Sequence, residues 1–208
     1  MNTDPSMTPR VHRPLLIVVS APSGAGKTTL CDRLLAERSS MVYSISCTTR
    51  TPRGDEVDGR DYHFLSVPEF ERRVVAGEFI EHAMVHGNRY GTLRQTVLES
   101  LSAGKDVLMD IDVQGAALIR AAAQGGEGLL KKGYVDIFIA PPSLEALRLR
   151  LTARNEDTPE VIERRVKNAV AEMARWREYQ YLVINDKLDE AYDDLLAVVR
   201  AEHCRTGS

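Results

Sequence analysis

One pattern occurs four times along this chain: a short, uninterrupted run of apolar residues is followed by a helical pattern. The apolar runs lie at residues 15–20, 106–112, 134–140 and 181–185. Strands that are apolar on both faces are typical of parallel sheets that helices cover on both sides. The repetition therefore predicts an α/β fold, with a parallel sheet core flanked by helices.

A glycine-rich turn separates the first apolar run from its helix, which is expected from about Lys27 to Glu37. A strand, such a turn and a helix that begins with Lys-Thr form the context of a P-loop. Backbone N–H groups and the helix dipole attract phosphate at this point. Lys27 would reach the β- and γ-phosphates of a triphosphate, and the Thr28 hydroxyl would bind Mg²⁺ directly. The predicted phosphate-binding residues of this turn are Ala21, Pro22, Ser23, Gly24, Ala25, Gly26, Lys27, Thr28 and Thr29.

The turn departs from the pattern G-x-x-x-x-G-K-[ST], because Ala21 stands where the first glycine is expected. Pro22 follows it, and a proline ring disfavours the α region for the preceding residue. We therefore expect Ala21 to be extended with a negative φ, a conformation that does not need glycine. The alternative, a glycine-rich turn with an exposed lysine and no ligand, stays open on this motif alone.

The second apolar run ends in acid, with the sequence "VLMDID" at residues 107–112. Residues two apart on a strand point to the same face, so we expect Asp110 and Asp112 to share one cleft at the carboxyl end of the sheet. An acid in this position places the metal beside a P-loop, so we expect Asp110 to hold Mg²⁺ through water. The alternative is that these acids only cap the strand end.

Length and composition restrict the class of protein. A chain of 208 residues is long enough for one domain, and a net charge of −3 gives no reason to expect nucleic-acid binding. The apolar runs are far shorter than the ~20 residues of a membrane-spanning helix. Three cysteines without C-x-x-C spacing make disulfides and zinc sites unexpected and fit a reducing cytoplasm.

Two segments interrupt the alternation of strands and helices. Short alternating runs and turns at residues 42–92 indicate a small, mostly antiparallel insert with a helix at about 68–76 that ends at Gly77. An arginine-rich segment at 149–168 indicates two helices meeting at a turn, with Thr158 as N-cap and Pro159 following; this is a candidate lid. The predicted division is a flexible leader (1–13), a core (14–43, 93–148 and 169–208), the insert (44–92) and the lid (149–168).

Four motifs follow the P-loop in order: "SCTTRTPRGDEVDGRDY", "FIEHAMVHGNRYGT", "DIDVQGA" and "APPS". This series resembles the guanylate kinase family, in the nucleoside monophosphate kinase group. The resemblance extends over residues 15–203, nearly the whole chain. It implies that the insert binds GMP.

The resemblance assigns GMP-binding roles to eight residues. The phosphate-binding positions are Arg50, Arg53, Tyr62 and Tyr90, and the base-binding positions are Ser46, Glu81, Thr92 and Asp112. Guanidinium groups match phosphate oxygens in pairs. Guanine presents N1–H and an N2 amino group side by side, and the Glu81 carboxylate can accept both. Adenine lacks that pair of donors, so a buried Glu81 would reject it.

The lid also resembles the family. Arginines at positions 150, 154 and 165 would reach the phosphates of ATP and the group in transit, so Arg150, Arg154 and Arg165 are predicted catalytic residues beside Lys27 and Asp110. Asn155 follows Arg154 where the family has glycine, and asparagine tolerates turn conformations. Asn185 corresponds to a position near the adenine of ATP.

The activity that the resemblance implies is ATP + GMP ⇌ ADP + GDP with Mg²⁺, in purine nucleotide metabolism, with dGMP as a second expected acceptor. The expected partners are ATP and GMP, with no nucleic acid polymer and no membrane; the sequence leaves monomer and homo-oligomer open. Two alternatives stay open: a P-loop kinase for a different monophosphate, and a non-catalytic guanylate kinase-like interaction module.

Overall fold

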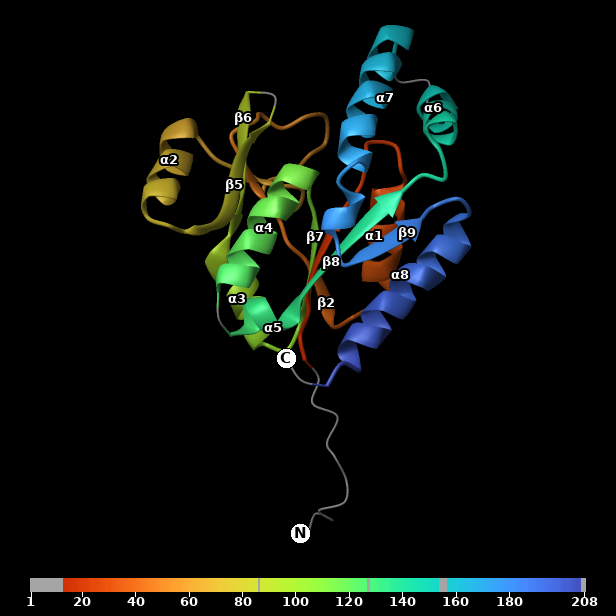
Figure 1. The fold of residues 1–208 in the computed structure, drawn as a ribbon. Helices are drawn as coiled ribbons and strands as arrows, with labels where there is room; N and C mark the ends of the chain where they lie inside the picture. The colour runs from red at the N-terminus through yellow and green to blue at the C-terminus, as the bar shows by residue number, and fades with distance from the viewer. Residues whose placement is uncertain (1–12, 86, 127, 154–156, 207–208) are drawn as a thin grey trace, which may run out of the picture.

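The computed structural model describes residues 13–85, 87–126, 128–153 and 157–206, so most of the predicted leader lies outside the described residues. Its main sheet has the strand order β2-β7-β1-β8-β9, and every neighbouring pair is parallel (Figure 1). The strands are β1 (Leu16–Ser20), β2 (Met41–Tyr43), β7 (Asp106–Asp110), β8 (Tyr134–Ala140) and β9 (Tyr181–Ile184). The predicted α/β fold is confirmed.

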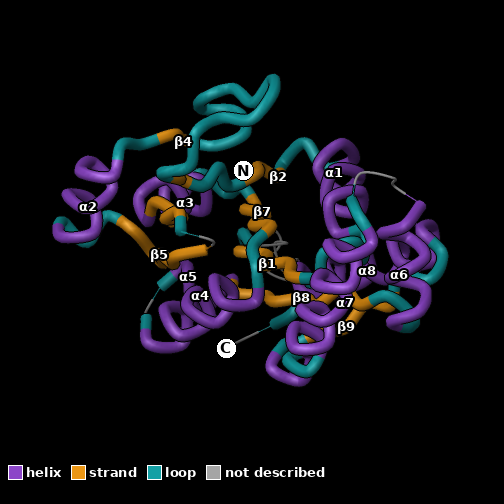
Figure 2. Tube along the Cα trace, turned by 90° about the horizontal axis from the view of Figure 1, so that it is seen from above, coloured by secondary structure: helices purple, strands orange, loops and turns teal. Residues whose placement is uncertain are grey.

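Helices cover both faces of this sheet, as the view from above in Figure 2 shows. The helices α1 (Lys27–Glu37) and α8 (Leu188–His203) pack on one face, and α3 (Arg94–Ser102), α4 (Val113–Gly125) and α5 (Leu129–Gly133) pack on the other. Alternate residues of β1 enter the two cores: Ile17 faces α1 and α8, and Val18 faces α3 and α4. Burial on both faces explains the uninterrupted apolar run. No helix in the described part of the chain is long and apolar enough to cross a membrane.

A second sheet, with the order β4-β3-β6-β5, is formed by β3 (Cys47–Thr48), β4 (His63–Phe64), β5 (Phe79–Val85) and β6 (Asn88–Leu93). The pairs β5–β6 and β3–β6 are antiparallel, and β3–β4 is parallel. The helix α2 (Val67–Val75) begins one residue before the predicted start, after the N-cap Ser66, and Gly77 follows it with a φ of +67°. The strand β2, which ends at residue 43 where the predicted core segment ends, pairs with β7 in the main sheet.

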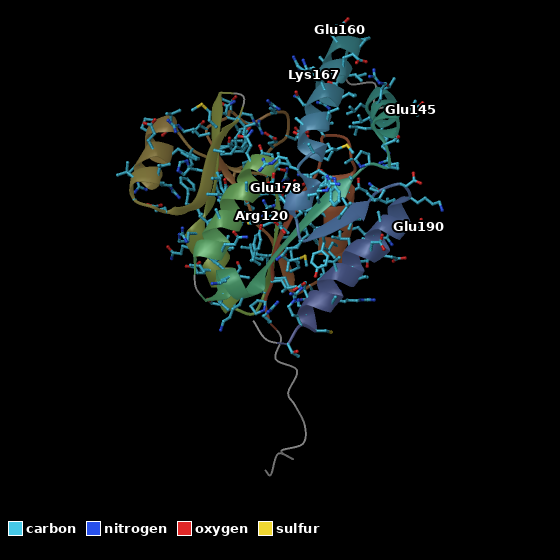
Figure 3. All side chains as sticks on the ribbon, in the orientation of Figure 1. Arg120, Glu145, Glu160, Lys167, Glu178 and Glu190 are labelled. Atoms are coloured by element: carbon cyan, nitrogen blue, oxygen red, sulfur yellow. The ribbon has the colours of Figure 1, made fainter. Side chains whose placement is uncertain are left out.

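Two further helices project beyond the end of the main sheet where β8 terminates (Figure 1). They are α6 (Leu144–Ala153) and α7 (Pro159–Met173), and a short 3₁₀ turn, η1 (Trp176–Glu178), follows them. Their contact is an apolar cluster that includes Leu147, Leu151, Ile162 and Val166. Polar residues such as Glu145 and Glu160 cover the outer surfaces of this pair (Figure 3). Proline occupies the start of α7, but the preceding Thr158 side chain makes no capping bond to a backbone N–H.

Candidate active site

In the glycine-rich turn after β1, both glycines have a backbone conformation that favours glycine, and a side chain on each would collide with a different neighbour. Gly24 and Gly26 have φ values of +92° and +89°, a region that side chains other than glycine rarely adopt. A Cβ on Gly24 would stand 2.8 Å from Cδ2 of Leu151 in α6, and one on Gly26 would collide with the side-chain amide of Asn185. The turn therefore packs closely against Leu151 of α6 and against Asn185, which follows β9.

Gly26 is the N-cap of the helix α1. Among the described residues, no side chain caps the first N–H groups of this helix, and its first turn contains no acidic residue. The first N–H groups of a helix need partners, and the helix dipole favours an anionic one. The P-loop therefore offers a backbone site for phosphate oxygens.

Lys27 and Asp110 form an ion pair across the carboxyl ends of β1 and β7. Burial lowers the pKa of Lys27 to about 8, although the carboxylates of Asp112 and Glu172 oppose that shift. A lysine that loses solvent in this way gains from a highly charged anion. The sequence did not indicate that Glu172 of α7 lies near Lys27, because α7 is far from the P-loop along the chain.

Asp112 corrects one sequence prediction. The strand β7 ends at Asp110, and Asp112 is the N-cap of α4 rather than a strand residue facing the same way. Its Oδ1 accepts the N–H groups of Gln114 at 3.0 Å and Gly115 at 2.8 Å. The expectation that Asp112 belongs to the strand was wrong, because two acids after an apolar run do not show where the strand stops. Both carboxylates nevertheless line one cavity.

Glu81 of β5 is a carboxylate with only 8% of its surface exposed. Burial raises its pKa to about 7, and Asp112 adds to the shift, while the Thr92 hydroxyl, which donates to Oε1 at 3.0 Å, opposes it. Gly115 lies beside both acids: a Cβ there would be in ordinary van der Waals contact, 3.4 Å from Oδ1 of Asp112 and 3.6 Å from Oε2 of Glu81. The site therefore holds two carboxylates that face a common space.

That space is a cavity of about 290 Å³ between the two sheets. It brings together predicted residues from the P-loop, from the acidic end of β7 and from the insert. These are Lys27, Ser46, Tyr62, Glu81, Tyr90, Asp110 and Asp112, with Ala83, Val85, Ile111 and Gly115 completing the wall. Lys27 gives the cavity a group suited to phosphate, and Glu81 and Asp112 give it groups suited to N–H donors.

The two arginines of the insert are placed differently. Arg50 is 8% exposed, and its guanidinium carbon lies 5.3 Å from the centroid of the Tyr62 ring. Arg53 is exposed, and neither of the two arginines lines the cavity. Sequence reasoning missed Glu56, which binds the Arg50 guanidinium in a bidentate ion pair. Its position three residues after Arg53 was the available signal.

The arginines of α6 and α7 do not line the cavity. Nη2 of Arg150 donates to the backbone carbonyl of Asp186 at 3.1 Å, and Arg165 pairs with Asp157 at 3.1 Å. Arg154 lies outside the described residues, as does Asn155. The structure therefore brings residues of the P-loop and the insert to one cavity, whereas the described lid arginines, Arg150 and Arg165, bond to residues outside that cavity.

Asn185, at the end of β9, supports the P-loop from behind. It is 5% exposed, and its Nδ2 donates to the backbone carbonyl of Ala25 at 2.7 Å. Its own N–H donates to the carbonyl of Ala140 at 2.8 Å, which continues the β8–β9 ladder. The predicted contact with adenine stays a prediction, and the bond to Ala25 was not anticipated.

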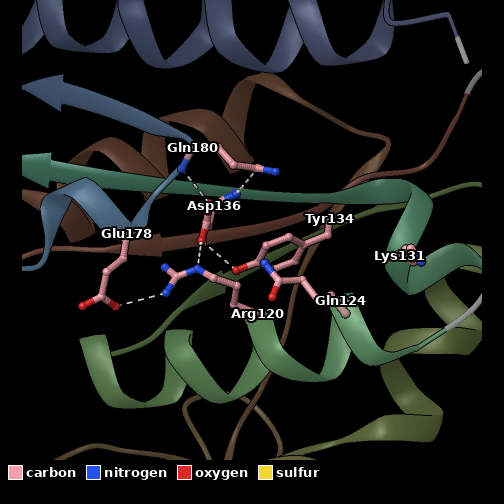
Figure 4. Close-up of a pocket in the computed structure, with 8 residues that line it drawn as sticks. Arg120, Gln124, Lys131, Tyr134, Asp136, Glu178 and Gln180 are labelled. Carbon is pink, nitrogen blue, oxygen red and sulfur yellow. Dashed lines mark hydrogen bonds and ion pairs between the residues drawn. The ribbon is translucent and has the colours of Figure 1, made fainter. Parts of the chain in front are cut away.

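A second cavity, of about 240 Å³, shares no lining residue with the first (Figure 4). At its base, Asp136 of β8 is fully buried and accepts hydrogen bonds from Nε of Arg120 at 2.7 Å and from the Tyr134 hydroxyl at 2.8 Å. The N–H of Gln180 donates to the other carboxylate oxygen at 2.8 Å. These hydrogen bonds join α4 and the segment before β9 to β8, although Nη2 of Arg120 is buried without a hydrogen-bond partner among the described residues.

The fold and the site together define a class of protein: a P-loop kinase with a polar cavity that adjoins the P-loop. A P-loop binds the phosphates of a donor, and the insert adds a polar cavity at the same edge of the sheet.

The comparisons with known proteins specify the family. The family model described as guanylate kinase matches residues 13–202, and the chain belongs to the guanylate kinase family. It is 50% identical over 193 residues to a guanylate kinase of Dechloromonas aromatica, covering 93% of this chain and 92% of the relative. It is 46% identical over 192 residues to one of Geobacter sulfurreducens, covering 92% and 91%. The crystal structure of a guanylate kinase from Anaplasma phagocytophilum superposes with a TM-score of 0.71 at 32% identity, covering 94% and 89%.

Proposed function

We propose that this chain is a cytoplasmic enzyme that transfers the γ-phosphate of ATP to GMP, giving ADP and GDP. The observation that carries the proposal is the cavity between the two sheets, where Lys27 of the P-loop and the acids Glu81 and Asp112 line one space. Membership of the guanylate kinase family supports it. The free thiols of Cys31, Cys47 and Cys204 fit a reducing compartment.

Guanine would be selected by the Glu81 carboxylate in this cavity. The ionised Glu81 can accept the N1–H and the N2 amino group of guanine together, and Thr92 holds the carboxylate in place through Oε1. Adenine presents no such pair, and leaving a buried carboxylate unpaired costs binding energy.

Phosphate transfer would take place beside Lys27. An oxygen of the GMP phosphate attacks the γ-phosphorus of ATP, the bond from that phosphorus to the bridging oxygen breaks, and ADP leaves. The attacking oxygen is already anionic, so the reaction needs alignment and charge stabilisation rather than a strong base. Lys27 would exchange its ion pair with Asp110 for the phosphates of ATP, which frees Asp110 for a second role.

That role is to hold a divalent metal, which we propose is Mg²⁺. The Thr28 hydroxyl and the Asp110 carboxylate are hard oxygen donors of the kind that Mg²⁺ prefers. The described residues contain no cluster of three or more His, Cys, Asp or Glu side chains able to hold a metal alone. This fits an ion bound mainly by the phosphates of ATP, where it neutralises charge on the transferring group.

The lid arginines would join the site when α6 and α7 close over it. Arg150 and Arg165 now bond to Asp186 and Asp157, and both partners can be exchanged for phosphate oxygens. Closure would also exclude water and so limit hydrolysis of ATP.

A coupled assay of ADP release over GMP, AMP, UMP and dTMP tests the proposal. GMP should be the preferred acceptor, and Glu81→Gln should reduce the preference for GMP over AMP. Preference for another monophosphate in the wild type would refute the proposed substrate. An unchanged preference in Glu81→Gln would refute the role of Glu81.

A further inference from the structure

Glu56 lies in the loop between β3 and β4 and joins the two arginines predicted to bind phosphate. Nη1 of Arg50 donates to Oε2 at 2.9 Å, and Nη2 donates to Oε1 at 2.8 Å. The backbone N–H of Arg53 donates to Oε2 at 2.8 Å, and the N–H of Glu56 donates to the Arg53 carbonyl at 3.0 Å. One carboxylate therefore fixes the backbone at one arginine and the guanidinium of the other.

The Arg50 guanidinium has two edges that can make paired hydrogen bonds. Its Nη1/Nη2 edge is taken by Glu56, and Nη1 also donates to the Thr51 carbonyl at 2.8 Å. These bonds leave Nε–H and one Nη2–H, which form the other edge, and the hydroxyls of Tyr90 and Tyr62 also interact with this guanidinium. The Tyr62 ring, whose centroid is 5.3 Å from the guanidinium carbon, packs beside the group, and Tyr62 and Tyr90 line the nucleotide cavity.

We propose that Glu56 is a positioning residue that holds Arg50 by one edge so that the other edge is presented to the phosphate of the acceptor nucleotide. The inference rests on the proposed function, because Arg50 meets a phosphate only if the cavity takes a nucleoside monophosphate. A free arginine side chain loses rotational entropy when it binds, whereas one that is already fixed loses less.

Charge alone predicts the opposite effect. Glu56 is an anion bonded directly to Arg50, so it cancels part of the charge that attracts the phosphate dianion and repels that dianion itself. If this repulsion were the larger effect, removing the charge would strengthen GMP binding. Glu56 is a quarter exposed, so solvent screens the repulsion, whereas paired hydrogen bonds depend strictly on the orientation of the guanidinium.

The test is the KM for GMP in Glu56→Gln and Glu56→Asp. Glutamine is isosteric but has one acceptor oxygen in place of two, and aspartate keeps the charge but is one methylene too short to reach both nitrogens. Each should raise the KM for GMP by about tenfold, the loss of one good charge-assisted contact. The KM for ATP, and kcat at saturating GMP, should stay at the wild-type values.

Glu71→Gln is the matched control. Glu71 lies in the same insert and accepts a hydrogen bond from Nη2 of Arg89 at 2.7 Å on an exposed surface. This substitution makes the same change in charge in the same insert without touching Arg50 or Arg53, so its KM for GMP should equal that of the wild type.

Inhibition by guanosine separates positioning of the arginine from general damage to the insert. Guanosine carries the base without the phosphate, so it should inhibit the wild type and Glu56→Gln equally well. Equal weakening of guanosine and GMP would overturn the inference, as would a lower or unchanged KM for GMP in Glu56→Gln. If the wild-type chain does not phosphorylate GMP, the proposed function itself is wrong. If the wild type is active and the Glu56 substitutions leave the KM for GMP unchanged, only the role of Glu56 is wrong.

Discussion

Affinity for GMP should depend on pH through Glu81. The guanine N–H donors need an ionised carboxylate, and burial holds the pKa of Glu81 at about 7 in the nucleotide-free protein. When only one protonation state binds, the apparent dissociation constant is the intrinsic value divided by the fraction in that state. With a pKa of about 7, the ionised fraction falls from about nine tenths at pH 8 to about one tenth at pH 6, so the KM for GMP should rise about tenfold.

The assay is the KM for GMP at pH 6, 7 and 8 with ATP saturating. The GMP phosphate also titrates near pH 6, so the comparison is with Glu81→Gln, in which the phosphate still titrates and the Glu81 carboxylate is absent. Guanosine inhibition, which involves no phosphate, should show the same tenfold dependence in the wild type and none in Glu81→Gln. Equal slopes in the two proteins would refute the reasoning.

The same carboxylate should weaken the nucleotide-free fold at high pH. Its pKa in the folded state lies above the unfolded value of 4.5, so the fold favours the protonated form. This contribution is complete below about pH 4.5 and is lost as the pH rises through about 7, a difference of about 3 kcal/mol. Glu81→Gln should therefore raise the melting temperature at pH 8 but not at pH 5. Equal changes at both pH values would contradict the buried, titrating carboxylate.

Three further substitutions test the division of roles. Lys27→Ala should lower kcat at least about a hundredfold and leave GMP affinity within about threefold, because Lys27 stabilises the transferring group. Stopped-flow turnover measures the first quantity and GMP titration the second. An equal loss of GMP affinity would argue against this role. Arg53→Ala keeps the N–H that binds Glu56 but removes the side chain, so steady-state kinetics should show a larger rise in the KM for GMP than for ATP; matched rises would contradict it. Ala21→Gly should leave ATP affinity nearly unchanged in a calorimetric titration. Gly24→Ala should abolish ATP affinity, because Gly24 has a φ of +92° and Leu151 occupies the space for a Cβ. A large gain in ATP affinity in Ala21→Gly would show that the methyl group obstructs the loop.

Local chemistry made the fold and the P-loop predictable. Apolar runs buried on both faces indicate parallel strands, and the helix after the P-loop spans Lys27–Glu37 as predicted, because a glycine turn fixes its start. The pairing partner of β2 was harder to predict, because β2 is a strand of three residues whose pairing with β7 is not local.

The sequence alone determined the class of fold, the phosphate-binding loop and the types of residue available for chemistry, because periodicity and glycine requirements act over a few neighbouring residues. Only the tertiary structure decided which of those residues meet. It placed Asp112 at a helix cap near Glu81, and it placed Asn185 under the carbonyl of Ala25, which is 160 positions away in the chain. It also raised the pKa of Glu81, since desolvation depends on what covers a carboxylate and not on the residues beside it in the chain.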